Sequence, residues 1–288
     1  METSSDLRFW LVTTDHLAKR LWFKDEEDFK AGMNFVALLA SGKTVSVLAF
    51  ILMSNHVHFI LAGSRDQATA FIQEFKKKYS QYYSHKYKTK ELLRGNGIDI
   101  RELFLNEESF ERAFAYVQMN CVAARICLHP TGYPWGTGDS FFNATQPNGT
   151  QLGRISVRKN ARLFHSTIQM PQTDFLTGSG YINPFSYVPV SFVESVFRTP
   201  GRMNYFLQNS SKSKNLKESP SFSDQLVFSA MKDLCISLFR KHSISELDEN
   251  QQAGLLKQIR YRFSSDPKQL ERISGIPYGT ITMLLELF

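Results

Sequence analysis

At 288 residues, 42% of them hydrophobic, the chain is long enough for one large or two small domains with a sizeable buried core. A net charge of +7 and a pI near 9.2 favour a polyanionic partner, with nucleic acid first and an acidic membrane surface second. Three cysteines without CxxC spacing indicate neither a disulfide framework nor a zinc knuckle, and without a signal pattern or a membrane-length apolar run we expect a reduced, cytosolic protein with no membrane partner.

The first half of the chain alternates strand and helix patterns. Strands are predicted over 7–13, 48–53, 56–61 and 98–105, and helices over 25–39, 66–87 and 107–126. The order β, α, β, β, α, β, α predicts an α+β domain over 1–145, a ferredoxin-like antiparallel sheet with helices on one face.

The second half divides into three parts. Residues 146–208 carry many prolines and glycines but keep their aromatic residues, which predicts an irregular segment of short strands or turns packed on the first domain. Residues 209–222 are rich in serine and lysine and have the composition of a linker. Residues 223–288 show helical patterns again and predict a separate small all-α domain.

Two histidines interrupt the most apolar stretch of the chain. Residues i and i+2 of a strand point to the same face, so His56 and His58 are expected to project together, with Val57 opposite. Two imidazoles held in this way can serve as two ligands of a metal ion. The alternative is a pair of structural histidines with ordinary hydrogen-bond partners.

The helix predicted over 107–126 places two polar side chains four residues apart on the face that packs against the sheet, Tyr116 and Asn120. Burying an amide without a partner costs about 1–3 kcal/mol. A metal ion bound by the histidines would be such a partner for Asn120, and Tyr116 would then place its phenol oxygen beside that metal. Alternatively, both side chains form hydrogen bonds with the sheet.

Three segments carry a resemblance to a known family. Residues 48–61, LAFILMSNHVHFIL, resemble the His-hydrophobe-His segment of single-tyrosine HUH transposases. Within that family, the resemblance is greater to the REP-associated tyrosine transposases. Residues 115–125, AYVQMNCVAAR, are similar to that family's Tyr-Ile-x-x-Asn-Pro-Val segment, and Tyr133-Pro134-Trp135 matches its Tyr-Pro-Trp. The chain departs from the family at Cys121, where proline is usual, at Gln118, where histidine is frequent, and in its long middle segment.

The resemblance implies an enzyme, a metal-dependent DNA strand transferase. Tyr116 would be the nucleophile, and His56, His58 and Asn120 would hold Mg²⁺ or Mn²⁺. The substrate would be single-stranded or hairpin DNA, cleaved and rejoined through a 5′-phosphotyrosine. A relaxase or replication-initiator nickase is the alternative enzyme, and a non-catalytic DNA-binding regulator is the alternative outside enzymes. A transposase of this kind would be a cytoplasmic, nucleoid-associated bacterial protein.

The helix over 66–87 offers rival tyrosines in a basic setting, namely Tyr79, Tyr82, Tyr83 and Tyr87. Mixed aromatic and basic side chains suit stacking on bases and contacts with phosphates. The residues expected to contact DNA here are Lys76, Lys77, Lys78, Tyr82, Lys86 and Lys88. The alternative is a solvated basic helix.

The last segment predicts a helix-turn-helix. Residues 268–278 resemble that motif in replication-initiator-type DNA-binding domains, with Gly275 at the turn. Such a motif places its second helix in the major groove of duplex DNA. Tyr278, Thr280, Thr282 and Met283 would then face the bases, and Arg260, Arg262 and Lys268 the phosphates. The alternative is a small helical protein-interaction domain.

Overall fold

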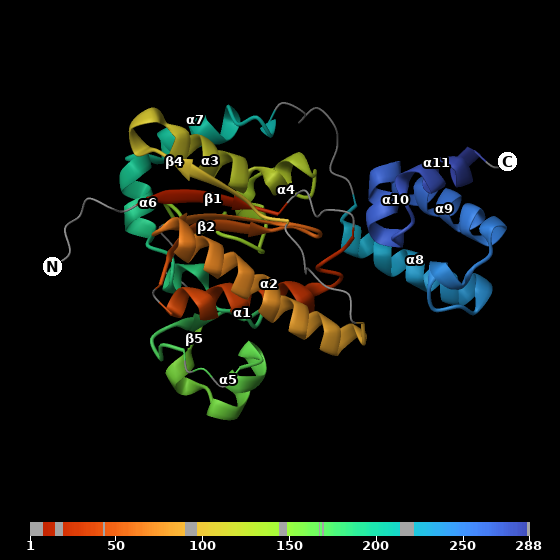
Figure 1. Cartoon of the computed structure of the whole chain (residues 1–288), viewed down its shortest axis with the longest axis horizontal. Helices are drawn as coiled ribbons and strands as arrows, with labels where there is room; N and C mark the ends of the chain where they lie inside the picture. Colours follow the sequence, from red (N-terminus) through yellow and green to blue (C-terminus); the bar gives the residue numbers. More distant parts are fainter. Residues whose placement is uncertain are drawn as a thin grey trace.

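A four-stranded antiparallel sheet forms the centre of the larger part of the molecule. The computed structural model describes residues 8–14, 20–42, 44–89, 97–143, 149–166, 168, 170–213 and 222–286. The strands β1 (Phe9–Thr13), β2 (Ser46–Leu52), β3 (Val57–Ala62) and β4 (Asp99–Leu103) lie in the order β2-β3-β1-β4, and every neighbouring pair is antiparallel (Figure 1). The predicted α+β class is confirmed, and the predicted strands differ from the observed ones by a few residues at their ends.

Strand β3 is apolar on both of its faces. Phe59 and Leu61 belong to the hydrophobic core on one side of the sheet, whereas Ile60 and Ala62 belong to the core on the other side. His58 lies on the side of Ile60, because side chains alternate along a strand. Both faces of the sheet therefore need a covering layer.

Helices cover the sheet on both faces. Helices α1 (Glu26–Ser41) and α2 (Arg65–Tyr87) cover one face, and α3 (Ser109–Gln118), α6 (Val190–Phe197) and α7 (Pro200–Gln208) cover the other. Figure 1 shows α1 and α2 below the sheet and α3 and α7 above it. The prediction that the helices share one face is therefore wrong for the third helix, since an apolar second face cannot be left to water.

The predicted helix 107–126 is divided in two. Helix α3 ends at Gln118, and a short helix α4 (Asn120–Ala123) follows after Met119. The Asn120 side-chain amide donates to the carbonyl of Tyr116 at 2.8 Å, the group that would accept from the Asn120 backbone N–H in a continuous helix. A side-chain bond of this kind to the preceding turn favours a bend or break in a helix, and it lies at the point where this helix divides.

The middle segment is more regular than its composition predicts. Two short strands, β5 (Thr150–Gln151) and β6 (Phe175–Leu176), pair with each other, and α5 (Val157–Phe164), α6 and α7 are helices that were not predicted. The buried Asn34 of α1 holds this segment, because its side chain donates to the carbonyls of Leu163 and Gly180 at 3.3 Å each. The segment thus packs on the first domain through specific hydrogen bonds.

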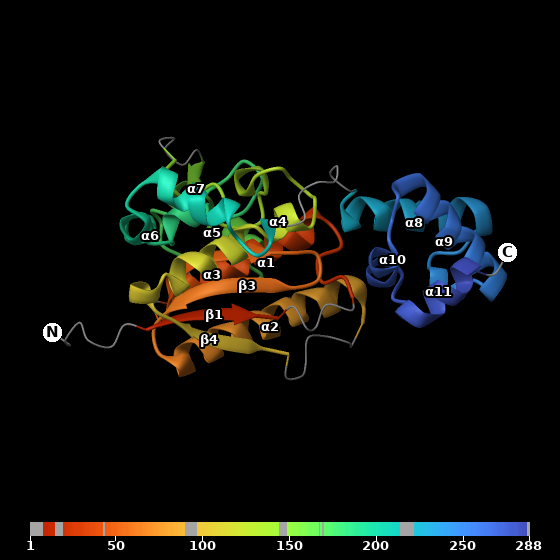
Figure 2. The same cartoon turned by 90° about the horizontal axis from the view of Figure 1, so that it is seen from above.

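Four helices at the C-terminal end form a third core, to which Leu21 from the first part of the chain also contributes. They are α8 (Asp224–Phe239), α9 (Glu249–Phe263), α10 (Pro267–Ser274) and α11 (Tyr278–Glu286) (Figure 2). Of the predicted linker 209–222, residues 214–221 lie outside the described part of the chain. None of the described helices is both long enough and apolar enough to cross a membrane.

The two parts of the chain meet beside the turn between β2 and β3. The Ser54 hydroxyl in that turn donates to the carboxylate of Asp224 at 2.7 Å. Arg272 of α10 donates to the two oxygens of the same carboxylate at 2.9 and 3.0 Å, and the Gln269 side-chain amide donates at 3.0 Å. Burial alone would raise the pKa of the Asp224 carboxyl, but Arg272 and these hydrogen bonds lower it below its usual value.

Candidate functional site

The histidine pair lies where β3 leaves the turn that follows β2. His58 is fully buried on β3, and His56 is half-buried just before the strand begins. Their ring centroids are 4.8 Å apart and the rings are nearly perpendicular. The Met53 N–H donates to the His56 carbonyl at 2.8 Å and closes the turn. The same-face placement expected from the strand pattern is therefore observed.

Tyr116 and Asn120 reach this pair from the end of α3. The ring centroids of His58 and Tyr116 are 5.3 Å apart, in an edge-to-face arrangement. Asn120 is buried, and its NH₂ group donates to the carbonyls of Tyr116 and Val117 at 2.8 and 3.3 Å. The structure thus brings the predicted nucleophile next to a predicted metal ligand and ties it to another.

The donor atoms suit a divalent transition-metal ion. The Nδ1 atom of His56 lies 2.7 Å from the Asn55 side-chain oxygen, so a proton on Nδ1 would leave Nε2 as the ligating atom. The hydrogen bonds of Asn120 occupy its NH₂ group, so the side-chain oxygen is the end that could ligate a cation. Within the described ranges, no three or more His, Cys, Asp or Glu side chains gather into a further metal-binding group.

The Tyr133-Pro134-Trp135 segment braces the end of β2, directly before the histidine turn. The Tyr133 hydroxyl donates to the carbonyl of Leu52 at 2.7 Å, and the Leu52 N–H donates to the Trp135 carbonyl at 2.8 Å. Gly136 follows with its backbone against β2, where a Cβ atom would lie only 2.6 Å from the Phe50 carbonyl oxygen. This close approach fixes the position of the strand end from which His56 emerges.

Gln118 links α3 to the segment after Trp135 and, through it, to β2. Its side-chain amide donates to the Thr137 hydroxyl at 2.7 Å, and the Phe50 N–H donates to that hydroxyl at 3.0 Å. Gln118 is therefore occupied in holding α3 against β2, and this contact fixes the end of the helix that carries Tyr116.

The rival tyrosines of α2 are engaged elsewhere. Tyr79 is fully buried and donates to the Trp22 carbonyl, and Tyr82 and Tyr87 donate to the Asp28 carboxylate at 3.1 and 2.7 Å. Burial and the charge of Asp28 raise the pKa of Tyr83 to about 12 and that of the other three phenols further above the usual value. A phenol that resists ionisation is a poor nucleophile at neutral pH.

The lysines of α2 are only partly available to a ligand. Lys86 donates to the Asp25 and Asp28 carboxylates at 2.6 to 2.7 Å, and Lys76 is buried, which lowers its pKa. Lys77 and Lys78 lie near Glu74 on the surface, and Lys88 follows the helix end. The DNA contacts expected of this helix, including Tyr82, stay predictions, and among its expected DNA-contacting lysines Lys77 and Lys88 are exposed, whereas Lys78 is half-buried.

The C-terminal helices have the predicted turn. Gly275 ends α10 in the left-handed conformation, with φ of +73°, and α11 begins at Tyr278. On α11, Tyr278, Thr280 and Met283 are exposed and Thr282 is half-buried. The three expected phosphate-contacting residues, Arg260, Arg262 and Lys268, are also exposed.

One residue at the site was missed by sequence reasoning. The Lys212 ammonium lies 4.7 Å from the ring centroid of Tyr116, in a segment whose composition predicts a linker. No local pattern could have found this contact, because it depends on how α7 packs against α3.

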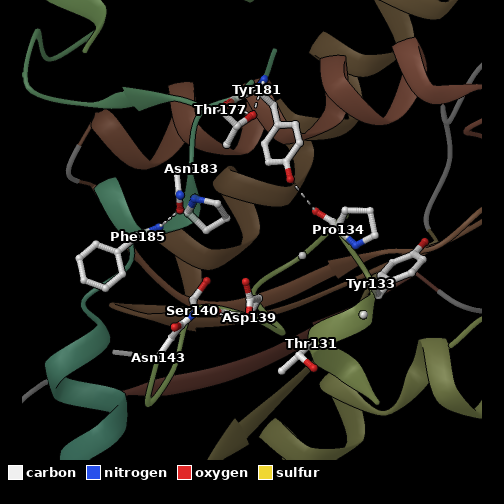
Figure 3. A pocket seen from close by; sticks show the side chains of 13 residues that line it. Thr131, Tyr133, Pro134, Asp139, Ser140, Asn143, Thr177, Tyr181, Asn183 and Phe185 are labelled. Carbon is white, nitrogen blue, oxygen red and sulfur yellow. Dashed lines mark hydrogen bonds between the residues drawn. The ribbon is translucent and has the colours of Figure 1, made fainter. Parts of the chain in front are cut away.

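A separate cavity of about 730 Å³ lies between residues 131–143 and 177–185. Figure 3 shows Asp139 and Ser140 on one side of it and Tyr181 on the other, where the Tyr181 hydroxyl donates to the Pro134 carbonyl at 3.3 Å. Its lining includes none of the candidate metal ligands and not Tyr116.

No family model, no curated protein and no solved structure matches this chain. The functional assignment therefore rests on the geometry of the site itself.

Proposed function

We propose that the chain is a single-tyrosine HUH transposase that cleaves and rejoins single-stranded or hairpin DNA. Three things support this: the contact of Tyr116 with His58, the buried Asn120 one turn after Tyr116, and the pairing of His56 with His58. The contact between Tyr116 and His58 carries the proposal, because it joins a nucleophile to a metal ligand across two different elements. The order β2-β3-β1-β4 with α1 and α2 on one face is the arrangement of a ferredoxin-like domain, which supports an HUH fold for this part.

His56, His58 and the side-chain oxygen of Asn120 would hold the ion. Imidazole ligands favour Mn²⁺ over Mg²⁺, although both are working ions in the family that the sequence resembles. When bound, a divalent ion supplies Lewis-acid polarisation of a phosphate oxygen. The Asn55 hydrogen bond to His56 and the Asn120 bonds to the α3 carbonyls hold two of these side chains in place before DNA arrives.

Tyr116 would be the nucleophile. Its phenol loses its proton, its oxygen forms a bond to phosphorus, and the bond from phosphorus to the 3′ oxygen breaks. The 3′ oxygen takes up a proton and leaves as a hydroxyl, while the 5′ phosphate stays on the tyrosine. Because an ester replaces an ester, the strand can be rejoined by the reverse step without an external energy source. The half-buried position of Tyr116 leaves its ring accessible to a strand end.

The C-terminal helices would bind duplex DNA beside the cleavage site. The exposed side chains of α11 and the exposed basic residues around it support a helix-turn-helix that enters the major groove. Phosphate contacts would come from Arg260, Arg262 and Lys268, and base contacts from Tyr278, Thr280 and Thr282.

Covalent capture tests the proposal. The full chain is incubated with a pool of labelled single-stranded hairpin DNAs and Mn²⁺, and protein-linked DNA is isolated under denaturing conditions and sequenced. The expected result is a covalent adduct enriched in particular sequences, with the DNA attached through its 5′ phosphate. Failure of every DNA in the pool to form an adduct would leave a DNA-binding regulator as the better account.

A further inference from the structure

Lys212 is the cation that the structure brings to the ring of Tyr116. It is half-buried, and its ammonium lies 4.7 Å from the ring centroid. A lysine over a tyrosine ring is held there by the attraction between its charge and the ring electrons. Its four-carbon stem also lets the ammonium move over the ring edge towards the phenol oxygen.

The position of Lys212 is fixed by the packing of α7 on α3. Arg202 near the start of α7 donates to the buried Glu111 of α3 at 2.8 Å. Because Arg202 lies beside Glu111 and Lys212 lies beside Tyr116, the chain after α7 follows α3 towards its end. Both helices are seen together above the sheet in Figure 1.

A tight turn then holds the backbone around Lys212. The Ser213 N–H donates to the Ser210 carbonyl at 2.9 Å, and the Ser213 hydroxyl donates to the Gln208 carbonyl at 2.7 Å. Ser210 itself is buried. The serines that give this segment a linker-like composition therefore fold it back onto the end of α7 and turn Lys212 towards Tyr116.

We propose that Lys212 is a further catalytic residue, whose ammonium contacts the phosphate that is transferred to Tyr116. The proposal rests on the proposed function, since it needs Tyr116 to be the nucleophile. As the phenol oxygen bonds to phosphorus and the 3′ oxygen departs, negative charge increases on the oxygens around phosphorus. An ammonium placed beside the attacking ring stabilises that charge, and it contacts the substrate before and after the step.

The chain contains a matched control. Lys24 also lies over tyrosine rings, 5.0 Å from the centroid of Tyr83 and 4.3 Å from that of Tyr87. These rings belong to α2, on the opposite face of the sheet from Tyr116. Lys24→Met thus removes a comparable cation–ring contact and leaves the candidate site untouched.

The test compares Lys212→Met, Lys212→Arg and Lys24→Met in single-turnover adduct formation with saturating hairpin DNA and Mn²⁺. Lys212→Met should slow adduct formation by about 10²-fold, the typical effect of removing one group that stabilises transition-state charge. Lys212→Arg should recover most of that loss because it keeps the charge, and Lys24→Met should match the wild type. A lysine that served only to hold the ring through the cation–ring attraction would, when removed, slow adduct formation by no more than about fivefold.

A second readout does not depend on turnover. In a Tyr116→Phe background, Lys212→Met should weaken single-stranded DNA binding and reduce the slope of log affinity against log salt by about 0.7, the value for one phosphate contact. Equal rates and equal slopes for Lys212→Met and Lys24→Met would overturn the proposal while Tyr116→Phe still abolished the adduct. An adduct that persisted in Tyr116→Phe would instead overturn the proposed function, and the role of Lys212 with it.

Discussion

Replacing Asp224 with asparagine should destabilise the junction between the two parts of the chain. The Asp224 carboxylate is 7% exposed and accepts hydrogen bonds from Arg272, Gln269 and Ser54. Removing one partner of a buried ion pair costs about 3–5 kcal/mol, because the other charge is left buried. Since the Arg272 side chain is 28% exposed and can regain some water, we expect the lower end, about 3 kcal/mol.

The assay is urea denaturation followed by circular dichroism, at neutral pH and in acid. A carboxyl whose pKa is lowered by folding stabilises the folded state at pH values above its unfolded pKa of about 3.9. That stabilisation disappears as the pH falls through the lower, folded pKa. The difference between wild type and Asp224→Asn should therefore be full at pH 7 and shrink below about pH 4.

Asp233→Asn is the control, because Asp233 is an exposed carboxylate on the same helix. Its effect should stay within about 0.5 kcal/mol, as for most surface substitutions. If Asp224→Asn changed the free energy of unfolding no more than Asp233→Asn, the ion pair would not hold the junction and the reasoning would be refuted.

Two further predictions concern the ligands. His56→Ala and His58→Ala should each abolish Mn²⁺ binding measured by calorimetry while circular dichroism stays near that of the wild type, and equal Mn²⁺ affinity in all three proteins would show that the ion is held elsewhere. Arg260→Ala should weaken duplex DNA binding and lower its salt slope by about 0.9, the loss of one phosphate contact, whereas Lys232→Ala on α8 should not. Equal salt slopes for these two variants would show that Arg260 on α9 does not contact a DNA phosphate.

The sequence predicted the parts of the site that depend on local periodicity. The two-residue repeat of the strand predicted over 56–61 put His56 and His58 on one face, and the 4.8 Å between their ring centroids agrees with it. The four-residue spacing of Tyr116 and Asn120 likewise put both at the end of the third helix, where Asn120 bonds to the Tyr116 carbonyl.

Features set by distant packing could not be predicted from such patterns. The lysines and tyrosines of α2 predict a surface that contacts DNA. The sequence pattern does not reveal that Asp25 and Asp28 at the start of α1 bind Lys86, Tyr82 and Tyr87. Lys212 was assigned to a linker for a similar reason, because only the contact of α7 with α3 brings it to Tyr116. In both cases the deciding partner lies far away in the chain.

The break after Gln118 has a more local cause, which periodicity alone does not reveal. An asparagine in a helical pattern can bond to a carbonyl of the preceding turn and compete with the backbone. Here α3 ends at Gln118, two residues before Asn120, and α4 starts at Asn120, whose side chain makes this bond. The same hydrogen bonds orient the side-chain oxygen that the proposed metal site requires.

The most direct test of the central claim compares Tyr116→Phe with Tyr83→Phe. Each substitution removes one phenol oxygen and keeps a ring that has a lysine ammonium within 5.0 Å of its centroid. After incubation with labelled hairpin DNA and Mn²⁺, denaturing gel electrophoresis should show the covalent adduct in wild type and Tyr83→Phe, and none in Tyr116→Phe. A persistent adduct in Tyr116→Phe, with its loss in Tyr83→Phe, would contradict the assignment of the nucleophile.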